Sequence, residues 1–314
     1  MPLRIVFCGT PEFAVPSLRH LLAQPDFQIV GAVTQPDRPR GRAFAISSTP
    51  VKEAAVAAGI PVYQPAKIKS DEAFEFFKQA APDAVVIIAY GQIIPQRLIE
   101  IPRLGWINLH GSLLPKYRGA APIHRAITNG ENRTGLTTMN IDAGLDTGPT
   151  LLRFETEIGA DETAPELYAR LSEAGAPLVA ETLLGLDRGT ITPLPQDNSQ
   201  ASFASPLKKE EGRIDWSLTA QQIYNRIRGL QPWPGAFTSF RGKNCAIWGR
   251  PVSANAAVGV PLGEILKARG KVVVACGDGT SLLLEFLQLE GRKRVTALEF
   301  ANGARLAPGD RFIS

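Results

Sequence analysis

The chain has 314 residues, of which 44% are hydrophobic and 20% charged, and a formal net charge of +4 at pH 7. This length is sufficient for two domains, each with its own core. No apolar run approaches the roughly 20 residues that cross a bilayer, which excludes a membrane-spanning protein. Because Met1 leads directly into an apolar strand, we expect no signal peptide and a cytoplasmic protein.

The N-terminal part of the chain alternates short apolar runs with helical patterns. This alternation predicts an α/β fold, a doubly wound (Rossmann-like), mostly parallel sheet. The turn Gly9-Thr10-Pro11 carries one glycine and does not form the GxGxxG loop of dinucleotide-binding proteins. We expect strands at Leu3–Cys8, Ile29–Thr34, Pro61–Tyr63, Asp83–Ala89, up to His110, Thr134–Asn140 and Thr150–Glu157. We expect helices from Pro11 and over Val51–Ala58, Ser70–Ala80, Pro122–Asn129 and Thr163–Leu186.

A long polar segment, Gln35 to Pro50, follows the second expected strand. It holds three prolines and the arginines Arg38, Arg40 and Arg42, so we expect a loop. Long loops between short elements are usually functional or disordered. The arginine spacing suits phosphate contacts, and an ordinary solvated loop fits these residues equally well.

The C-terminal part differs in pattern and in charge. The irregular stretch 188–209 is the expected linker, which divides the chain into domains 1–187 and 210–314. After a helix near Leu218–Arg228, short strands at Ala236–Phe240, Cys245–Trp248, Gly263–Ala268, Val272–Cys276 and Ser281–Glu290 predict a small barrel. From Lys208 onward, 16 basic and 9 acidic residues give +7, against 18 − 21 = −3 before it. This favours a polyanionic partner for the C-terminal domain, although ordinary solvated surface is the alternative.

Cys8, Cys245 and Cys276 are isolated, without a CxxC pair or the spacing of a metal site. We therefore expect three buried, reduced thiols and no metal site built on them. A catalytic thiol at Cys8 is the minor alternative.

The strand that ends at His110 carries the strongest candidate for chemistry. Period-2 alternation places Asn108 and His110 on one face and Leu109 on the other. A glycine-rich loop at 141–149 adds Asp142 and Asp146. Asn108 can donate to an oxyanion, His110 can carry a proton, and Asp146 can orient and charge the imidazole.

This set of residues lacks an activated covalent nucleophile, because Ser112 is in no GxSxG elbow. It therefore favours direct acyl transfer to a substrate amine. A turn asparagine, a structural histidine and a two-carboxylate metal loop remain the alternatives for Asn108, His110 and the pair Asp142 and Asp146.

These residues also carry a family resemblance. Asn-x-His-x-Ser-Leu-Leu-Pro-x-Tyr-Arg-Gly at 108–119, with Gly-Leu-Asp-Thr-Gly at 144–148, resembles the folate-dependent formyltransferases. Further motifs resemble the members of that family that act on methionyl-tRNA, and together they cover essentially the whole chain. They are Phe-x-Gly-Thr-Pro-Glu-Phe at 7–13, Thr-Gln-Pro-Asp-Arg-Pro at 34–39, Gly41-Arg42, Pro-Val-Lys at 50–52, Ala-x-Pro-Leu-Lys-Lys-Glu-Glu-Gly-Arg-Ile-Asp-Trp at 204–216 and Arg-x-Arg-Gly-Leu-x-Pro-Trp-Pro-Gly at 226–235.

The resemblance implies transfer of a formyl group from 10-formyltetrahydrofolate to the α-amine of methionyl-initiator tRNA, by a monomer that needs no metal. It implies a formyltransferase domain followed by a small OB-like barrel. Asn108 and His110 would stabilise the oxyanion, with Asp146 assisting. Folate would bind to Ala89, Tyr90, Gly91, Gln92, Ile93, Ser112, Leu113, Leu114, Pro115 and Asp142. The tRNA would contact Arg38, Arg40, Arg42, Lys208 and Lys209.

One departure and three rivals accompany this interpretation. Where loops of the family often carry a lysine pair, this chain has Ala43-Phe44-Ala45-Ile46. We therefore expect Phe44 and Ile46 to insert against the tRNA as a wedge, and this contact to matter as much as the pairing of arginines with phosphates. A sugar-amine formyltransferase and a formyltetrahydrofolate hydrolase would share Asn108, His110 and Asp146. The arginine loop and the basic barrel argue against the first, and the absence of an extra N-terminal domain argues against the second. The intact residue set argues against a non-catalytic tRNA-binding module.

Overall fold

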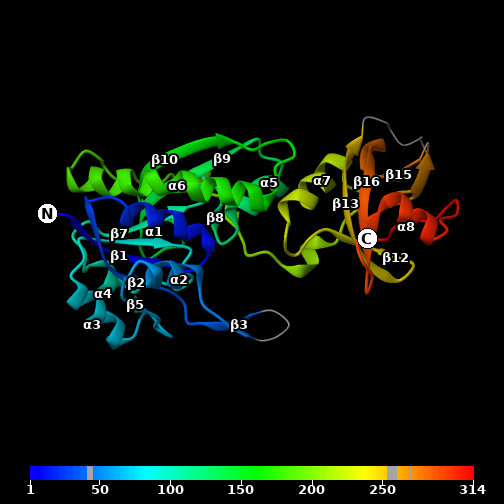
Figure 1. Cartoon of the computed structure of the whole chain (residues 1–314). Coiled ribbons are helices and arrows are strands. Elements are labelled where there is room, and N and C mark those ends of the chain that lie inside the picture. Colours follow the sequence, from blue (N-terminus) through cyan, green and yellow to red (C-terminus); the bar gives the residue numbers. More distant parts are fainter. Residues whose placement is uncertain (41–44, 253–259, 269) are drawn as a thin grey trace. The chain divides into compact units, whose positions relative to one another are not determined.

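A computed structural model describes residues 1–40, 45–252, 260–268 and 270–314, and only the backbone of residues 39, 40, 45, 46, 267 and 268. The chain forms two compact units (Figure 1). Unit 1 comprises Met1–Pro122, Arg133–Glu157 and Tyr168–Ala204, and unit 2 comprises Ile123–Asn132, Ile158–Leu167 and Ser205–Ser314. The predicted boundaries, with a linker at 188–209 between two domains, remain a prediction.

Unit 1 is built on a seven-stranded sheet in the order β10-β9-β7-β6-β1-β2-β5. Its strands are β1 (Leu3–Gly9), β2 (Phe27–Val33), β5 (Val62–Tyr63), β6 (Ala84–Ile88), β7 (Trp106–His110), β9 (Arg133–Asn140) and β10 (Thr150–Glu157). All pairs are parallel except β7 with β9 and β9 with β10. The predicted mostly parallel sheet is confirmed, and the strand order reverses between β1 and β6.

Helices cover both faces of this sheet: α1 (Val15–Leu22), α2 (Pro50–Ala57), α3 (Asp71–Ala80), α4 (Gln96–Ile99) and α6 (Ala164–Asp187) (Figure 1). On one face, Phe77 of α3 and Leu98 of α4 belong to the same buried cluster as Trp106 of β7. On the other face, α6 lies against β7 so closely that a Cβ on Gly175 would come within 2.5 Å of Leu109. Successive β7 side chains thus point to opposite faces, as the alternation predicts.

The arginine segment differs from the irregular loop expected there. It contains two short strands, β3 (Arg38–Arg40) and β4 (Ala45–Ser47), which pair with each other in antiparallel orientation because extended segments can share backbone hydrogen bonds. At its base, the Asp37 carboxylate accepts hydrogen bonds from Lys52 and Gln64, which lower the pKa of Asp37. The predicted roles of Arg42 and Phe44, and of the Arg40 and Ile46 side chains, lie outside the described residues.

Unit 2 contains an antiparallel sheet curled into a half-barrel, consistent with the predicted OB-like fold. The strand order is β12-β13-β16-β15-β14, with β17 also paired to β16. The strands are β12 (Phe237–Phe240), β13 (Lys243–Val252), β14 (Ile265–Ala268), β15 (Lys271–Ala275), β16 (Ser281–Leu289) and β17 (Val295–Thr296). A register shift at Trp248/Gly249 helps the sheet to curl.

Three helices belong wholly or largely to unit 2: α5 (Pro122–Thr128), α7 (Ala220–Gly229) and α8 (Ala297–Gly303). Helix α5 packs on α7 at Gly229, where a Cβ would lie 2.7 Å from Thr128. Helix α8 is absent from the sequence-based expectation. Its capping box, in which Thr296 and Glu299 exchange hydrogen bonds, is the signal that could have revealed it.

The remaining short elements are β8 (Arg118–Gly119) and β11 (Phe203–Ala204), which pair with each other in unit 1, and single 3-10 turns. These turns are η1 (Glu12–Ala14), η2 (Asn198–Gln200), η3 (Lys209–Gly212) and η4 (Gly277–Gly279). None of the helices in the described part of the chain has the length and apolar character needed to cross a membrane.

The ion pair between Arg125 of α5 and Glu211 makes the stability of unit 2 depend on pH. Hydrogen bonding by Arg125 lowers the pKa of Glu211 from its ordinary 4.5. A carboxyl group whose pKa is lower in the folded than in the unfolded protein stabilises the folded state at pH values above its unfolded pKa. This stabilisation is lost as the pH falls through the folded pKa. Glu211→Gln should therefore cost about 1 kcal/mol at pH 7, and this cost should shrink as the pH falls below 4.5 and through the lowered folded pKa of Glu211.

Urea unfolding followed by tryptophan fluorescence at pH 7 and pH 3 measures this difference. Glu290→Gln is the matched control, because Glu290 is exposed and its side chain has no partner among the described residues. A Glu211→Gln penalty of the same size at pH 3 would assign the effect to packing instead of charge.

Candidate active site

Asn108 and His110 end strand β7 side by side, and both are almost fully buried, with 8% and 6% of their surfaces exposed. The Asn108 amide makes no hydrogen bond to any residue in the described part of the chain. A buried side-chain amide normally has partners. Because a small part of Asn108 is still exposed, its N–H groups remain able to donate to a ligand oxygen.

Both ring nitrogens of His110 face oxygen acceptors. Nε2 lies 2.9 Å from the Tyr117 carbonyl oxygen, which can only accept, so this nitrogen carries a proton. Nδ1 lies 3.6 Å from the Asp146 carboxylate, which is an ion-pair distance and longer than a hydrogen bond. A proton on Nδ1 would face the Asp146 carboxylate across this longer distance.

The position of Asp146 is set by the backbone around it. Its carboxylate accepts a hydrogen bond of 2.7 Å from the Gly119 N–H, and Asp146 itself has a left-handed φ of 52°. Gly119 has a φ of +117°, and a Cβ there would lie 2.8 Å from the Ala204 carbonyl oxygen. Only glycine tolerates both this φ and this close approach, which explains why the motif at 108–119 ends in a glycine.

Two residues outside the predicted set hold the Asp146 loop. The Gln196 side-chain amide donates to the carbonyl oxygens of Asp146 (2.8 Å) and Gly148 (2.7 Å). Its oxygen accepts from the buried Arg118 guanidinium at 2.8 and 3.1 Å. Arg118 lies within the motif at 108–119, but Gln196 falls in the expected linker and no local pattern marks it.

Gln196→Ala should lower the rate of the reaction at this site by about tenfold, because the loss of two hydrogen bonds to the Asp146 loop loosens the carboxylate beside His110. As a positioning residue, Gln196 should affect the maximal rate and its pH profile more than substrate affinity. Gln200→Ala is the control, since Gln200 is exposed and its side chain donates to Asp197. Equal effects of the two substitutions would contradict this role.

Ser112, Leu113, Leu114 and Pro115 form a turn directly after β7. The Ser112 hydroxyl donates to the Lys116 carbonyl oxygen at 2.6 Å, and Thr137 donates to the Ser112 carbonyl oxygen at 2.7 Å. Ser112 and Leu114 are each 1% exposed, and the Leu114–Pro115 peptide is cis. The hydroxyl of Ser112 is thus hydrogen-bonded within the turn. A ligand could contact the half-buried side chains of Leu113 and Pro115.

The segment after β6 borders a cleft of about 460 Å³ at the point where the strand order reverses. Ligands of open α/β sheets bind at such switch points. Tyr90, Gly91 and Gln92 line the cleft together with Thr10, Gln35, Pro36, Arg38, Ser47, Thr49 and Ala66. Ala89 and Gly91 have φ values of 47° and 87°, and Ile93 is 89% exposed.

Tyr90 contributes its backbone to this cleft, and its side chain lies in the core. Its carbonyl oxygen accepts from Thr10 and Gln35, while the ring is 2% exposed and the hydroxyl has no partner among the described residues. Burial raises the pKa of the Tyr90 hydroxyl well above its ordinary value. Burying an unpaired hydroxyl costs about 1–3 kcal/mol.

Tyr90→Phe should therefore raise the free energy of unfolding by about 1 kcal/mol and leave activity at this site unchanged. Tyr168→Phe is the matched control, because the Tyr168 hydroxyl accepts from the Phe13 N–H at 3.2 Å. That substitution should destabilise the protein instead. Urea unfolding of both variants checks the pair, and destabilisation by Tyr90→Phe would show that its hydroxyl is paired.

The other predicted residues lie as follows. The Asp142 carboxylate folds its own loop by accepting from the Gly144 N–H (3.0 Å) and the Thr147 hydroxyl (2.8 Å). Arg38 is exposed at the cleft in unit 1, whereas Lys208 and Lys209 are exposed in unit 2. Arg40 and Arg42 lie outside the described side chains.

The three cysteines are free and buried, as predicted, and burial raises the pKa of the Cys8 thiol well above its ordinary value. A cysteine that is buried in this way is a poor nucleophile. In the ranges that the structure describes, no three His, Cys, Asp or Glu side chains are grouped as metal ligands.

The chain is similar to known proteins along most of its length. A family described as formyl transferase matches residues 3–183, and the formyl transferase C-terminal domain matches residues 206–305. Proteins named methionyl-tRNA formyltransferase from Solibacter usitatus and Acidobacterium capsulatum are 53% and 50% identical to it over 310 residues each. Each alignment covers 98% of this chain, and 98% and 99% of the two relatives.

Solved structures show the same fold at lower identity. WlaRD, a sugar 3N-formyl transferase solved in the presence of dTDP and 5-N-formyl-THF, is 20% identical with a TM-score of 0.68, over 93% of this chain and 100% of that one. HypX from Aquifex aeolicus, solved with tetrahydrofolic acid, is 17% identical with a TM-score of 0.62, over 100% of this chain and 51% of that one. With both domain matches and relatives of about 50% identity, this chain belongs to the formyl transferase family.

Proposed function

We propose that this protein is a methionyl-tRNA formyltransferase, which moves the formyl group of 10-formyltetrahydrofolate to the α-amine of methionyl-initiator tRNA for translation initiation. The relatives that bear this name match nearly the full chain at about 50% identity. The observation that carries the chemistry is the amide of Asn108, which has no hydrogen bond within the described part of the chain and lies beside the His110–Asp146 pair at the end of β7.

The reaction joins the amine nitrogen to the formyl carbon and breaks the bond from that carbon to N10 of the donor. Negative charge develops on the formyl oxygen while both bonds are partly present. The Asn108 amide has free N–H groups to donate to that oxygen, and the imidazolium of His110 adds a positive charge beside it. Both groups lie at the end of a buried strand, where they need little reorganisation.

Protons must leave the attacking amine and reach the departing N10. An α-amine has a pKa of about 7.7–8.0, so a fraction is neutral near pH 7 without a strong base. His110 can relay the proton through Nδ1, on the side where the contact with Asp146 is loose at 3.6 Å. Asp146, held by Gly119, stabilises the charged ring during this relay.

We place the folate between the segment Ala89–Ile93, the turn Ser112–Pro115 and the loop that carries Asp142. The donor supplies the activated formyl group, and this chain supplies backbone groups and apolar surface to hold the pterin. Exposed Ile93 and Leu145 offer apolar surface, and the left-handed backbone at Ala89 and Gly91 suits a close approach of the chain to a ligand. Two structural neighbours were solved with folates, which supports this choice of co-substrate.

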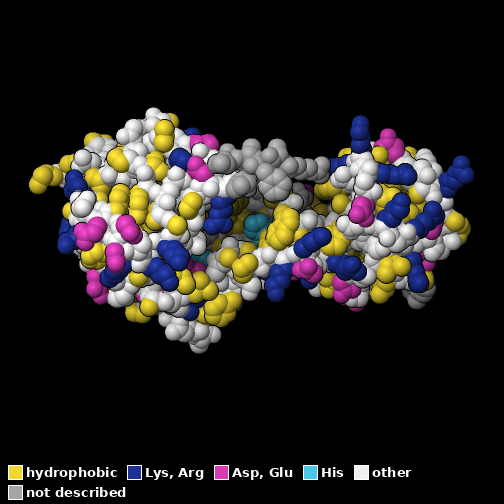
Figure 2. Space-filling model, turned by 90° about the horizontal axis from the view of Figure 1, so that it is seen from below, with side chains coloured by type: hydrophobic (Ala, Val, Ile, Leu, Met, Phe, Trp, Pro, Cys, Tyr) yellow, Lys and Arg dark blue, Asp and Glu magenta, His cyan; other side chains and the backbone are white. Residues whose placement is uncertain are grey.

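We propose Arg38, Arg40, Arg42, Lys208 and Lys209 as contacts for the tRNA. Arg38 lines the cleft at the switch point, and Lys208 and Lys209 are exposed. Figure 2 shows several Lys and Arg side chains on the face in view, and such cations can pair with phosphates. We expect the enzyme to act in the cytoplasm as a monomer and without a metal.

The choice of acceptor tests this proposal. Formyl transfer from 10-formyltetrahydrofolate would be measured with charged initiator tRNA, charged elongator methionine tRNA and a dTDP-amino sugar. Rapid formylation of the initiator alone supports the proposal. Transfer to the amino sugar with none to either tRNA would leave a sugar-amine formyltransferase in its place.

A further inference from the structure

Unit 2 contains a cavity of about 580 Å³ that the proposed chemistry does not use. All of its lining residues belong to unit 2: Phe240, Arg241, Lys243, Leu289, Arg292, Lys293, Val295, Glu299, Phe300, Gly303 and Ala304. This volume lies in the range of sites for small molecules, roughly 300–1,000 Å³. The inference drawn from it does not depend on the function proposed for unit 1.

The floor of the cavity is apolar and rigid. The rings of Phe240 and Phe300 meet edge to face with centroids 5.1 Å apart, and they are 3% and 7% exposed. Half-buried Leu289 and Val295 complete this surface. A ligand seated here therefore needs an apolar part that can lie against aromatic rings.

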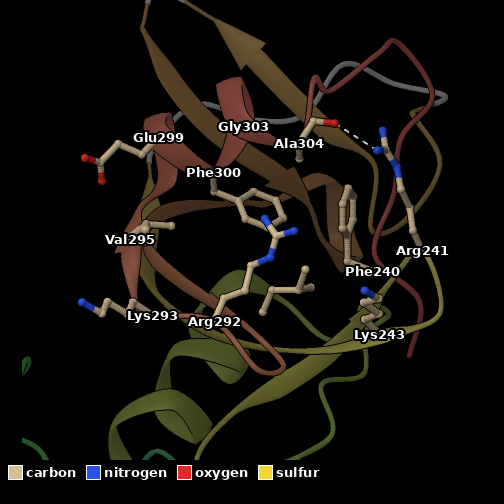
Figure 3. A pocket seen from close by; sticks show the side chains of 11 residues that line it. Phe240, Arg241, Lys243, Arg292, Lys293, Val295, Glu299, Phe300, Gly303 and Ala304 are labelled. Atoms are coloured by element: carbon tan, nitrogen blue, oxygen red, sulfur yellow. Dashed lines mark hydrogen bonds between the residues drawn. The ribbon is translucent and has the colours of Figure 1, made fainter.

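Two cationic side chains extend into the cavity. Figure 3 shows Arg292 and Lys243 extending toward the space beside Phe240 and Phe300, whereas Lys293 and Glu299 point away from it. The charged ends of Arg292 and Lys243 make no hydrogen bond or ion pair with the described residues. Glu299 does not neutralise them, because its carboxylate accepts from the N–H and hydroxyl of Thr296.

The turn that carries Arg292 is fixed in place. Arg292 donates its N–H to the Leu289 carbonyl oxygen and accepts from the Gln288 side chain at its own carbonyl. Two residues on, the Arg294 guanidinium lies 4.4 Å from the Trp248 ring centroid and 4.3 Å from that of Phe286. These hydrogen bonds fix the backbone of Arg292 before a ligand arrives, so binding needs to order only its side chain.

The opposite wall is fixed as well. Arg241 pairs with Asp310 at 2.7 Å and donates to the Ala304 carbonyl oxygen at 2.9 Å, as the dashed line in Figure 3 shows. Its charge is committed within the protein. Arg292 and Lys243 are thus the cations left for a ligand, and a guanidinium with a nearby ammonium matches one phosphate group.

We propose that this cavity binds a phosphorylated nucleoside, with the base against Phe240, Phe300 and Leu289 and the phosphate between Arg292 and Lys243. A flat aromatic base fills the apolar floor, and the dianionic phosphate uses both free cations. The same chemistry is offered by a free nucleotide and by an unpaired nucleotide of an RNA strand.

Isothermal titration calorimetry of the full-length protein tests this site with AMP, adenosine, ribose 5-phosphate and the unpaired oligonucleotide AAAA of RNA. We expect AMP to bind with a Kd below about 1 mM. Adenosine and ribose 5-phosphate, each lacking one half of the ligand, should bind at least about tenfold more weakly. Their comparison tests the apolar floor without mutating its buried rings.

Arg292→Ala and Lys243→Ala should each weaken AMP binding by about tenfold or more. Both residues are exposed, so the variants should fold. Lys271→Ala is the matched control, because Lys271 is an exposed lysine of unit 2 outside the cavity. Binding of the oligonucleotide alone, with the same dependence on Arg292 and Lys243, would identify RNA as the source.

Three results would overturn the proposal. They are equal binding of ribose 5-phosphate and AMP, equal weakening by Lys271→Ala and Arg292→Ala, and no binding of AMP or the oligonucleotide at millimolar concentrations. The first two would reduce the site to nonspecific attraction of anions by a basic surface. None of them bears on formyl transfer in unit 1.

Discussion

Replacing His110 by alanine is expected to slow single-turnover formyl transfer by at least about a hundredfold, while the affinity for 10-formyltetrahydrofolate stays within about threefold. In the proposed mechanism, the substitution removes the positive charge beside the developing oxyanion and the group that relays the proton. It leaves Asn108, the Asp142 loop and the cleft at the switch point in place. Rapid-quench measurement at saturating tRNA gives the rate, and equilibrium titration gives the folate affinity.

His20→Ala is the control for this experiment. His20 lies on α1, where its ring pairs with Gln24 at 2.6 Å, away from the end of β7. That variant should keep the native rate. A His110→Ala enzyme within about tenfold of the native rate would remove His110 from the chemistry.

Asn108→Ala is expected to cost about 10²–10³ in the same rate, which is the usual effect of losing one oxyanion donor. The amide of Asn108 has no other hydrogen bond among the described residues, so its loss disturbs the protein little. The folate affinity should again be nearly unchanged, because the interaction forms with the charge of the transition state.

Asn108→Asp separates hydrogen-bond donation from packing. It keeps the size of the side chain and replaces the donor by an acceptor, so its rate should fall at least as far as that of Asn108→Ala. An Asn108→Asp enzyme with the native rate would show that Asn108 fills space and does not donate.

Much of the fold could be predicted because local pattern and tertiary context agree. The apolar runs of β1 and β6 and the alternation of β7 each match the strand that forms. Short elements escaped prediction where the pattern is weak. Helix α8 has only seven residues, and the pairing of β3 with β4 lies in a segment rich in proline.

Some features of the candidate site could likewise be predicted from the sequence, and others could not. Asn108 and His110 share one strand, so their relation follows from period 2. The support of Asp146 depends on Gln196, 50 residues further along the chain, and no local signal connects the two. Likewise, Arg125 and the segment Ile158–Leu167 belong to unit 2 through tertiary contacts that the chain order does not reveal.

Direct transfer of the formyl group from the folate to the tRNA amine is best tested by a single-turnover experiment with labelled formyl donor and charged initiator tRNA. Samples quenched over time would be separated into folate, protein and tRNA. We predict that label leaves the folate and reaches the tRNA with one rate constant, without appearing on the protein. Label that passes transiently through the protein, on Ser112 or Cys8, would contradict direct attack by the amine at Asn108 and His110.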